Sequence, residues 1–285
     1  MKTASLTSRE EPQCYESARL GWERLSEIRL LSGVDTRALS RSNSGDSATY
    51  NLRVPPGWSC EPDTDEATLE LFVLKGDVSL DGVRVGAGGY VFVPRGCGDA
   101  ELRSESGAQM LAFWNEQLAG FEGASHRITS WRKEPWVDLG GIPSMHGVMY
   151  KSLRLPDRGD GDVHGGPGGL LRMSFLPPAF ADPTEHVHKI WEEIYFLSGD
   201  LFMPPRGLLT TGTYLANPAH HWHAPMTTQF GSFMLVQTTA PVDQIPRPFD
   251  GGDAMVDGYR DKASWMEPPR YQDWDSAEAR YLGRD

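Results

Sequence analysis

An internal repeat of strand-length segments restricts the fold of this chain more than any other feature. The segment Glu70–Asp77 (ELFVLKGD) matches Glu193–Asp200 (EIYFLSGD) in its apolar pattern and its closing Gly-Asp. Three further pairs occur in the same order: Gly33–Leu39 with Gly147–Leu153, Thr49–Pro56 with Leu170–Pro178, and Gly88–Pro94 with Gly212–Pro218. Such ordered matches predict two homologous domains in tandem. The alternative is one long domain in which a single hairpin recurs.

The segments between turns have the length and composition of β-strands. Glycine (31) and proline (21) punctuate the sequence, and helical periodicity is weak. Short runs rich in Val, Leu, Phe and Tyr lie between these breaks, which is typical of strands. The runs are Thr49–Val54, Leu69–Leu74, Tyr90–Val93, Leu111–Trp114, Leu170–Phe175, Ile194–Leu197 and Phe233–Gln237. We therefore expect a mainly β protein.

Charge and composition exclude several functional classes. The net charge of −12 argues against nucleic-acid binding, which requires a basic surface. No apolar run approaches 18 residues, and the first residues lack the apolar stretch of a secretory signal. The three cysteines are far apart and form no CxxC motif, so a disulfide framework is not expected. We expect a cytoplasmic protein without membrane or nucleic-acid partners.

A histidine cluster in the second half predicts a metal site. His186 and His188 are one residue apart and therefore lie on the same face of a strand. Glu192 has the same parity, and His223 follows after the turn at Pro218. Three imidazoles and one carboxylate suit a divalent transition metal better than Ca²⁺ or Mg²⁺.

Two of these ligand assignments have alternatives. Glu193 is the residue that pairs with Glu70 in the repeat, although Glu192 keeps strand parity with the histidines. His221 could replace His223 as the last ligand. We prefer Glu192 and His223 as the ligands.

The spacing of these residues resembles the cupin superfamily in its two-domain (bicupin) form. The first cupin motif, G-x5-H-x-H-x(3,4)-E-x6-G, is matched by His186, His188, Glu192 and Gly199, with Phe180 in place of the leading glycine. The second, G-x5-P-x-G-x2-H, is matched by Gly212, Pro218 and His223, with His220 in place of the last glycine. The branch that includes the ChrR cupin domain and acetylacetone-cleaving enzymes is the most similar.

The resemblance implies two tandem antiparallel β-barrels (jelly rolls) and a metal-dependent enzyme. The favoured reaction is that of an Fe(II) dioxygenase on a small β-dicarbonyl or hydroxyketone-type substrate, with Zn, Mn, Ni or Cu as other possible metals. The alternatives are an O2-independent isomerase, lyase or hydrolase, and a non-catalytic Zn-binding sensor. Cupins commonly form dimers, so the resemblance also implies a homodimer.

The first domain is expected to be degenerate. Asp63 and Asp65 stand at its H-x-H positions, Glu70 follows, and Asp99 replaces the later histidine. An all-oxygen set could hold a hard cation. Aspartate is nevertheless common in turns, so we favour a domain that has lost its metal.

The expected domains are 1–125 (degenerate), 126–240 (metal-binding) and 241–285, an extension that packs on the body through its aromatic residues Trp265, Trp274 and Tyr281. Aromatic residues near the histidines suit barrel packing or a substrate pocket. Arg172, Tyr214 and Gln237 lie on expected strands or next to the motifs, and are candidates to bind substrate if they point inward.

Overall fold

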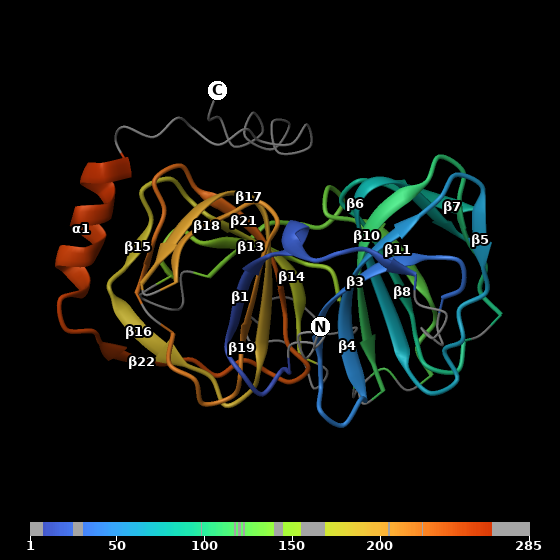
Figure 1. Ribbon diagram of the computed structural model, residues 1–285, viewed down its shortest axis with the longest axis horizontal. Helices are drawn as coiled ribbons and strands as arrows, with labels where there is room; N and C mark the ends of the chain where they lie inside the picture. The colour runs from blue at the N-terminus through green and yellow to red at the C-terminus, as the bar shows by residue number, and fades with distance from the viewer. Residues whose placement is uncertain are drawn as a thin grey trace. The chain divides into compact units, whose positions relative to one another are not determined.

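The computed structural model describes residues 8–24, 31–97, 99–116, 118, 121, 123–139, 145–154, 169–204, 206–223 and 225–263 (Figure 1). These residues form two compact units. Unit 1 contains residues up to Glu11, Ser17–Glu134 and a short segment that begins at Leu153. Unit 2 contains Pro12–Glu16, Pro135–Ser152 and the later described residues. None of the described helices is long and apolar enough to cross a membrane.

Unit 1 is built on an antiparallel sheet of ten described strands, ordered β11-β8-β6-β10-β4-β3-β2, with β5, β7 and β9 joined to it off this path. A 3₁₀ turn, η1 (Ser17–Arg19), precedes it. The strands are β2 (Glu23–Arg24), β3 (Asp35–Arg41), β4 (Ser47–Val54), β5 (Trp58–Cys60), β6 (Thr68–Leu80), β7 (Val83–Gly86), β8 (Gly89–Val93), β9 (Leu102–Ser104), β10 (Ala108–Asn115) and β11 (Arg127–Ser130).

Unit 2 repeats this architecture, again with ten described strands, ordered β1-β19-β17-β21-β14-β13-β12, with β15, β18 and β20 off this path. A two-stranded ribbon of β16 and β22 accompanies the sheet. The elements are β1 (Gln13–Glu16), β12 (Val137–Asp138), β13 (Met149–Ser152), β14 (Leu171–Leu176), β15 (Ala181–Asp182), β16 (Thr184–Val187), β17 (Glu192–Met203), β18 (Gly207–Thr210), β19 (Thr213–Asn217), β20 (Met226–Thr227), β21 (Ser232–Gln237), β22 (Ile245–Pro248) and helix α1 (Gly252–Ala263).

The two strand orders match position by position, which confirms the tandem mainly β architecture predicted from the repeat. In each unit a long central strand, β6 or β17, lies between its repeat-related neighbours. Each of the seven predicted strand runs falls in one described strand, although β14 begins at Leu171 rather than Leu170.

The repeated Gly-Asp has a steric cause in both central strands. Gly76 and Gly199 have φ values of 79° and 87°, in the left-handed region that favours glycine. A Cβ atom added at either position would lie 2.0 Å from the carbonyl oxygen of Gly107 or Gly231, respectively. The ladder is also irregular beside each glycine. Only glycine lets these long strands bend against the neighbouring backbone.

Alternation along β17 separates two faces of the unit 2 sheet. Ile194 and Phe196 belong to the apolar core together with Leu215, Met234 and Val236, and we call this side the inner face. Glu193 and Tyr195 lie on the opposite, outer face, because successive side chains of a strand alternate. Unit 1 has the corresponding apolar inner face, which includes Leu69, Leu71 and Val73 on β6.

The unit boundaries differ from the predicted ones. Strand β11, after the predicted boundary at residue 125, pairs with β8 and belongs to unit 1. Strand β1, near the start of the chain, pairs with β19 and belongs to unit 2. Both strands are held by edge pairing that no local sequence pattern encodes.

The described part of the C-terminal extension packs on unit 2. Strand β22 pairs with β16, and the ring of Tyr259 on α1 stacks on Phe202 at a centroid distance of 4.7 Å. The Tyr259 hydroxyl also donates a hydrogen bond to Asp200 Oδ2 at 2.9 Å. Trp265, Trp274 and Tyr281, to which the sequence assigned this packing, lie outside the described residues.

Candidate metal centre

Three histidines of unit 2 come together through main-chain pairing. His186 lies on β16 and exchanges backbone hydrogen bonds with His223, at N–O distances of 3.3 and 2.8 Å. His188 follows β16 on the same side as His186, and its carbonyl accepts a hydrogen bond from His220 N at 2.7 Å. The backbone thus joins the loop His220–His223 to the His186–His188 segment at two points.

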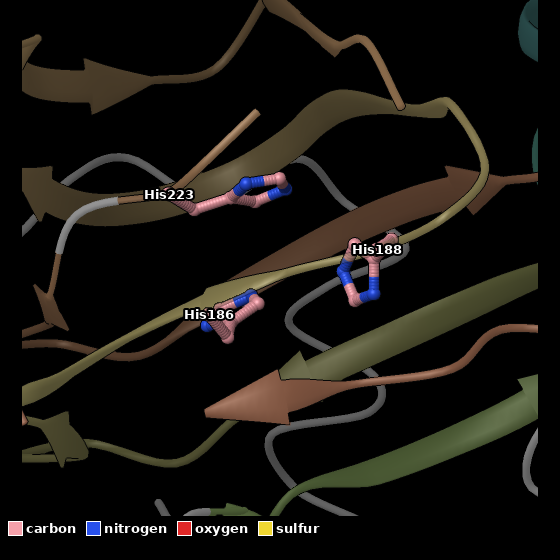
Figure 2. A group of neighbouring side chains, drawn as sticks. All are labelled: His186, His188 and His223. Atoms are coloured by element: carbon pink, nitrogen blue, oxygen red, sulfur yellow. The ribbon is translucent and has the colours of Figure 1, made fainter. Parts of the chain in front are cut away.

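The three imidazoles form one buried group, shown in Figure 2. Their side chains belong to residues only 4%, 3% and 2% exposed, and one nitrogen from each lies within 4.8 Å of the others. Ring centroids are 4.8 to 5.3 Å apart. Among the described residues this is the group of histidine, cysteine or acidic side chains with metal-ligand spacing.

Hydrogen bonds define which nitrogens are free to act as ligands. Nδ1 of His188 lies 2.6 Å from the carbonyl oxygen of Asp243, and Nδ1 of His223 lies 2.8 Å from that of His221. A carbonyl oxygen only accepts, so each Nδ1 carries a proton, and Nε2 is the nitrogen of each ring that can bind a metal. Fixing the tautomer in this way is the usual outer contact of a metal-binding histidine.

Glu192 completes the group from the first residue of β17. Its Oε2 lies 3.4 Å from Nε2 of His223 and 3.9 Å from Nε2 of His188. Asn217, directly opposite on β19, donates a hydrogen bond from Nδ2 to the same oxygen at 3.3 Å. Nε2 of His223 is buried and lies against this carboxylate oxygen. A cation between them would relieve this contact.

The protonation states also suit a metal ion. Burial, and to a smaller extent His223 and His188, together lower the pKa of His186 to about 3. This imidazole is therefore neutral near pH 7. Burial raises the pKa of Glu192, but contact with His223 and the other imidazoles outweighs burial and leaves the pKa below its ordinary value. A neutral His186 and an ionised Glu192 are the forms in which these two side chains bind divalent transition metals.

The neighbouring Glu193 lies on the opposite face of the sheet. Its Oε1 accepts a hydrogen bond of 2.6 Å from the hydroxyl of Tyr214. The structure thus brings Glu192, and not Glu193, to the histidines. It also corrects the placement of two substrate candidates, because Tyr214 and Gln237, which pairs in register with Glu193, lie on the outer face. Arg172, the third candidate, pairs with Val236 and lies on the inner face.

The histidines beside His223 lie outside the group. The ring of His221 is 6.5 Å from that of His223, and its contribution to the site is the backbone carbonyl. His220 is exposed and has a φ of 64°, in the region that favours glycine. This backbone conformation explains why the motif has glycine at the position of His220.

Unit 1 lacks the corresponding group in its described residues. Asp63, Asp65 and Asp99 are exposed, and Asp63 Oδ1 accepts a hydrogen bond from the backbone of Asp65 at 3.3 Å, as in a turn. Glu70 is buried on the outer face. Its Oε1 accepts a hydrogen bond of 2.5 Å from the hydroxyl of Tyr90, and its carboxylate forms an ion pair with Arg154. It is the counterpart of Glu193, while Leu69 stands at the position of Glu192. These placements agree with a first barrel that has lost its metal, which stays a prediction.

Two contacts of the centre were absent from the sequence interpretation. The segment that precedes β22 provides Asp243, whose carbonyl orients His188 and whose Oδ1 accepts a hydrogen bond from Lys189 N at 2.9 Å. Arg206, in the turn between β17 and β18, interacts electrostatically with Glu192, and its Nη1 is buried without a hydrogen-bond partner among the described residues. Neither residue belongs to a motif, so no local signal could have identified them.

Comparison with known proteins shows which fold the chain has. Residues 20–133 match a domain of unknown function, DUF4437. A cupin 2 conserved barrel protein from Leptotrichia buccalis shares 10% identity over 81% of this chain and 96% of its own, with a TM-score of 0.53. The chain has the cupin fold.

Two other cupin-type structures are similar over most of the chain. A proposed dioxygenase from Nostoc punctiforme shares 16% identity over 84% of this chain and 87% of its own, with a TM-score of 0.69. Salicylate 1,2-dioxygenase from Pseudoaminobacter salicylatoxidans shares 11% identity over 85% and 86%, with a TM-score of 0.59. No curated protein matches in sequence. At these identities the likeness concerns the fold.

Proposed function

We propose that this chain is a metal-dependent bicupin enzyme, an Fe(II) dioxygenase acting on a small oxygenated substrate of the β-dicarbonyl or hydroxyketone type. The observation that carries the proposal is the buried group of His186, His188 and His223 with the Glu192 carboxylate beside it. Three imidazoles and one carboxylate are side chains that would hold a divalent transition metal such as Fe(II).

The side chains have distinct roles in this proposal. The three histidines and Glu192 would hold the metal, and Asn217 would keep the carboxylate in place through its hydrogen bond. The carbonyls of Asp243 and His221 would fix the tautomers of His188 and His223. When bound, iron would supply a Lewis acid for the substrate oxygens and a centre that reacts with O2. Burial of the histidines would limit access of bulk water to the reacting atoms.

The similar structures support the reaction class by analogy. The Nostoc punctiforme protein is described as a proposed dioxygenase, and the Pseudoaminobacter salicylatoxidans protein as a salicylate 1,2-dioxygenase. Because one fold hosts many reactions, the proposal depends on the site and uses the analogy only to favour O2 chemistry. The ChrR-like branch, the homodimer and the cytoplasmic location stay predictions of the same kind.

Metal analysis followed by an oxygen-uptake screen tests the proposal. Protein purified without added metal should contain a divalent transition metal, and anaerobic loading with Fe(II) should give substrate-dependent O2 consumption with β-dicarbonyls or hydroxyketones. Turnover without O2 consumption would instead indicate an isomerase, lyase or hydrolase. A firmly bound Zn²⁺ with four protein ligands, no exchangeable water and no turnover would indicate a sensor.

A further inference from the structure

The C-terminal extension runs along the segment that carries two of the histidines. Figure 1 shows β22 beside β16, and in this pairing Pro246 lies opposite His186. Just before β22, the carbonyl oxygen of Asp243 lies 2.6 Å from Nδ1 of His188. Residues 243–248 thus contact the backbone at one histidine and the ring of the next, and we call them the strap.

Strand β16 depends on the strap because it lies outside the ten-stranded sheet of unit 2. Among the described strands its partner is β22, and His186 also forms an isolated bridge with His223. A buried strand that loses its partner leaves backbone N–H and C=O groups unpaired, which costs free energy. Without the strap, the strand that carries His186 would be held less firmly.

Side chains reinforce the contact between the strap and the metal-binding segments. Nε of Arg247 donates a hydrogen bond of 2.5 Å to Oε1 of Glu185. The guanidinium carbon of Arg247 lies 3.6 Å from the centre of the Trp222 ring, a cation–π contact. Glu185 directly precedes His186, and Trp222 directly precedes His223. One strap residue therefore contacts the neighbours of two ligands.

Helix α1, which follows the strap, is anchored to the barrel at two places. The ring of Tyr259 stacks on Phe202 at 4.7 Å, and its hydroxyl donates a hydrogen bond of 2.9 Å to Oδ2 of Asp200. Nη2 of Arg260 donates a hydrogen bond of 2.5 Å to the carbonyl oxygen of Ala179. The first anchor is on β17, whereas Ala179 precedes β15, so the two anchors are independent.

Resting on the metal site of the function proposed above, we propose that Tyr259 and Arg260 are positioning residues for the metal centre. They dock α1, the docked helix holds the strap against β16, and the strap holds His186 and His188 in place for the ion. Coupling between two sites is reciprocal. A metal that binds better when the strap is docked must therefore stabilise the docked strap and helix by the same factor.

Hydrogen exchange and metal titration of the full-length protein test this coupling. Backbone exchange is followed by mass spectrometry with and without Co²⁺, and Co²⁺ affinity is measured by calorimetry. We expect Co²⁺ to slow exchange in the strap and also in α1. Slower exchange in α1 distinguishes coupling from local protection at the metal. Y259F and R260M should each weaken Co²⁺ binding by about 5- to 20-fold, within the usual range of coupling between sites.

A matched control separates coupling from general loss of stability. Y90F removes the same hydroxyl from a buried tyrosine–carboxylate hydrogen bond of unit 1, and it should leave the Co²⁺ affinity unchanged. An equal loss of affinity in Y90F and Y259F would overturn the proposal.

Two further results would also overturn the coupling while Co²⁺ still binds. They are unchanged exchange of α1 on addition of Co²⁺, and wild-type affinity in both Y259F and R260M. A wild-type protein that binds no Co²⁺ would instead overturn the proposed metal site, and the coupling with it.

Discussion

At the scale of single residues, strand parity predicts which of the candidate ligands lie close together. Parity placed His186, His188 and Glu192 on one side, and the structure brings them together. The repeat pointed instead to Glu193, because that residue and Glu70 are true counterparts. Both bind a tyrosine on the outer face, so the repeated glutamate belongs to the shared fold. All residues of β19 and β21 are buried, so no alternation in the sequence could show that Tyr214 and Gln237 face outward.

Two histidine variants test whether His223 or His221 binds the metal. H223A should lose metal affinity by more than the roughly 10- to 100-fold cost of losing an outer contact, because it removes an inner ligand. H221A should retain the metal, since His221 contributes only its carbonyl. Metal content and dissociation constants of the purified variants give the answer, and the reverse pattern would assign the ligand to His221.

The adjacent glutamates provide a second matched pair. E192Q should weaken metal binding and leave the fold intact, because the amide keeps the shape but not the charge. E193Q should retain the metal and lower the free energy of unfolding by about 1–3 kcal/mol, because the buried hydrogen bond from Tyr214 loses its charged acceptor. Chemical denaturation and metal titration of both variants measure these effects. Loss of metal binding in E193Q, with normal binding in E192Q, would show that Glu193 is the ligand.

At the scale of elements, long-range pairing determines what the sequence could not predict. The strand runs were visible because turn residues bound them, whereas the positions of β1, β11 and β22 depend on partners far along the chain. Helix α1 was not predicted; it is tied to the barrel by Tyr259. Asp243 and Arg206 approach the centre through such connections, which explains why no motif contains them.

The segment before β22 should tune metal affinity. D243A removes the acceptor for the Lys189 backbone and the 3.2 Å ion pair with the Lys189 side chain, so the Asp243 carbonyl should hold His188 less firmly. We expect metal affinity to fall by about tenfold. D243N retains an acceptor oxygen and should restore most of the affinity. Equal affinity of D243A and wild-type protein would show that this segment does not position His188.

At the scale of the whole molecule, the two units share a fold and differ in chemistry. The inner face of unit 1 has Leu69 where unit 2 has Glu192, and Asp63, Asp65 and Asp99 are exposed. The sequence predicted this contrast because the repeat provides an internal comparison. It could not predict that β1 pairs within unit 2 and β11 within unit 1, which sets the boundaries of the units.

Acid should destabilise the metal-free protein through the centre in unit 2. The folded pKa of His186, about 3, lies below the ordinary value of 6.5, so its contribution to stability is present above pH 6.5 and is lost as pH falls toward 3. Glu192, whose folded pKa is also lowered, adds a loss of the same sign below its ordinary pKa of 4.5. Melting temperatures of metal-free protein should therefore drop from pH 7 to pH 4.

The variant H186N provides the comparison for this prediction. Asparagine does not titrate, so the decline between pH 6.5 and 4 should be shallower than in the wild-type protein. Parallel curves for the two proteins would mean that His186 does not govern the acid response.

The metal stoichiometry of the intact chain tests the central claim most directly, because the claim assigns one metal centre to unit 2 and none to unit 1. Elemental analysis after equilibration with excess Fe²⁺ or Co²⁺ and removal of free ion should give one metal per chain in the wild-type protein. The variant in which His186, His188 and His223 are all alanine should retain none. A wild-type value of two, or a metal retained by the triple variant, would contradict the account.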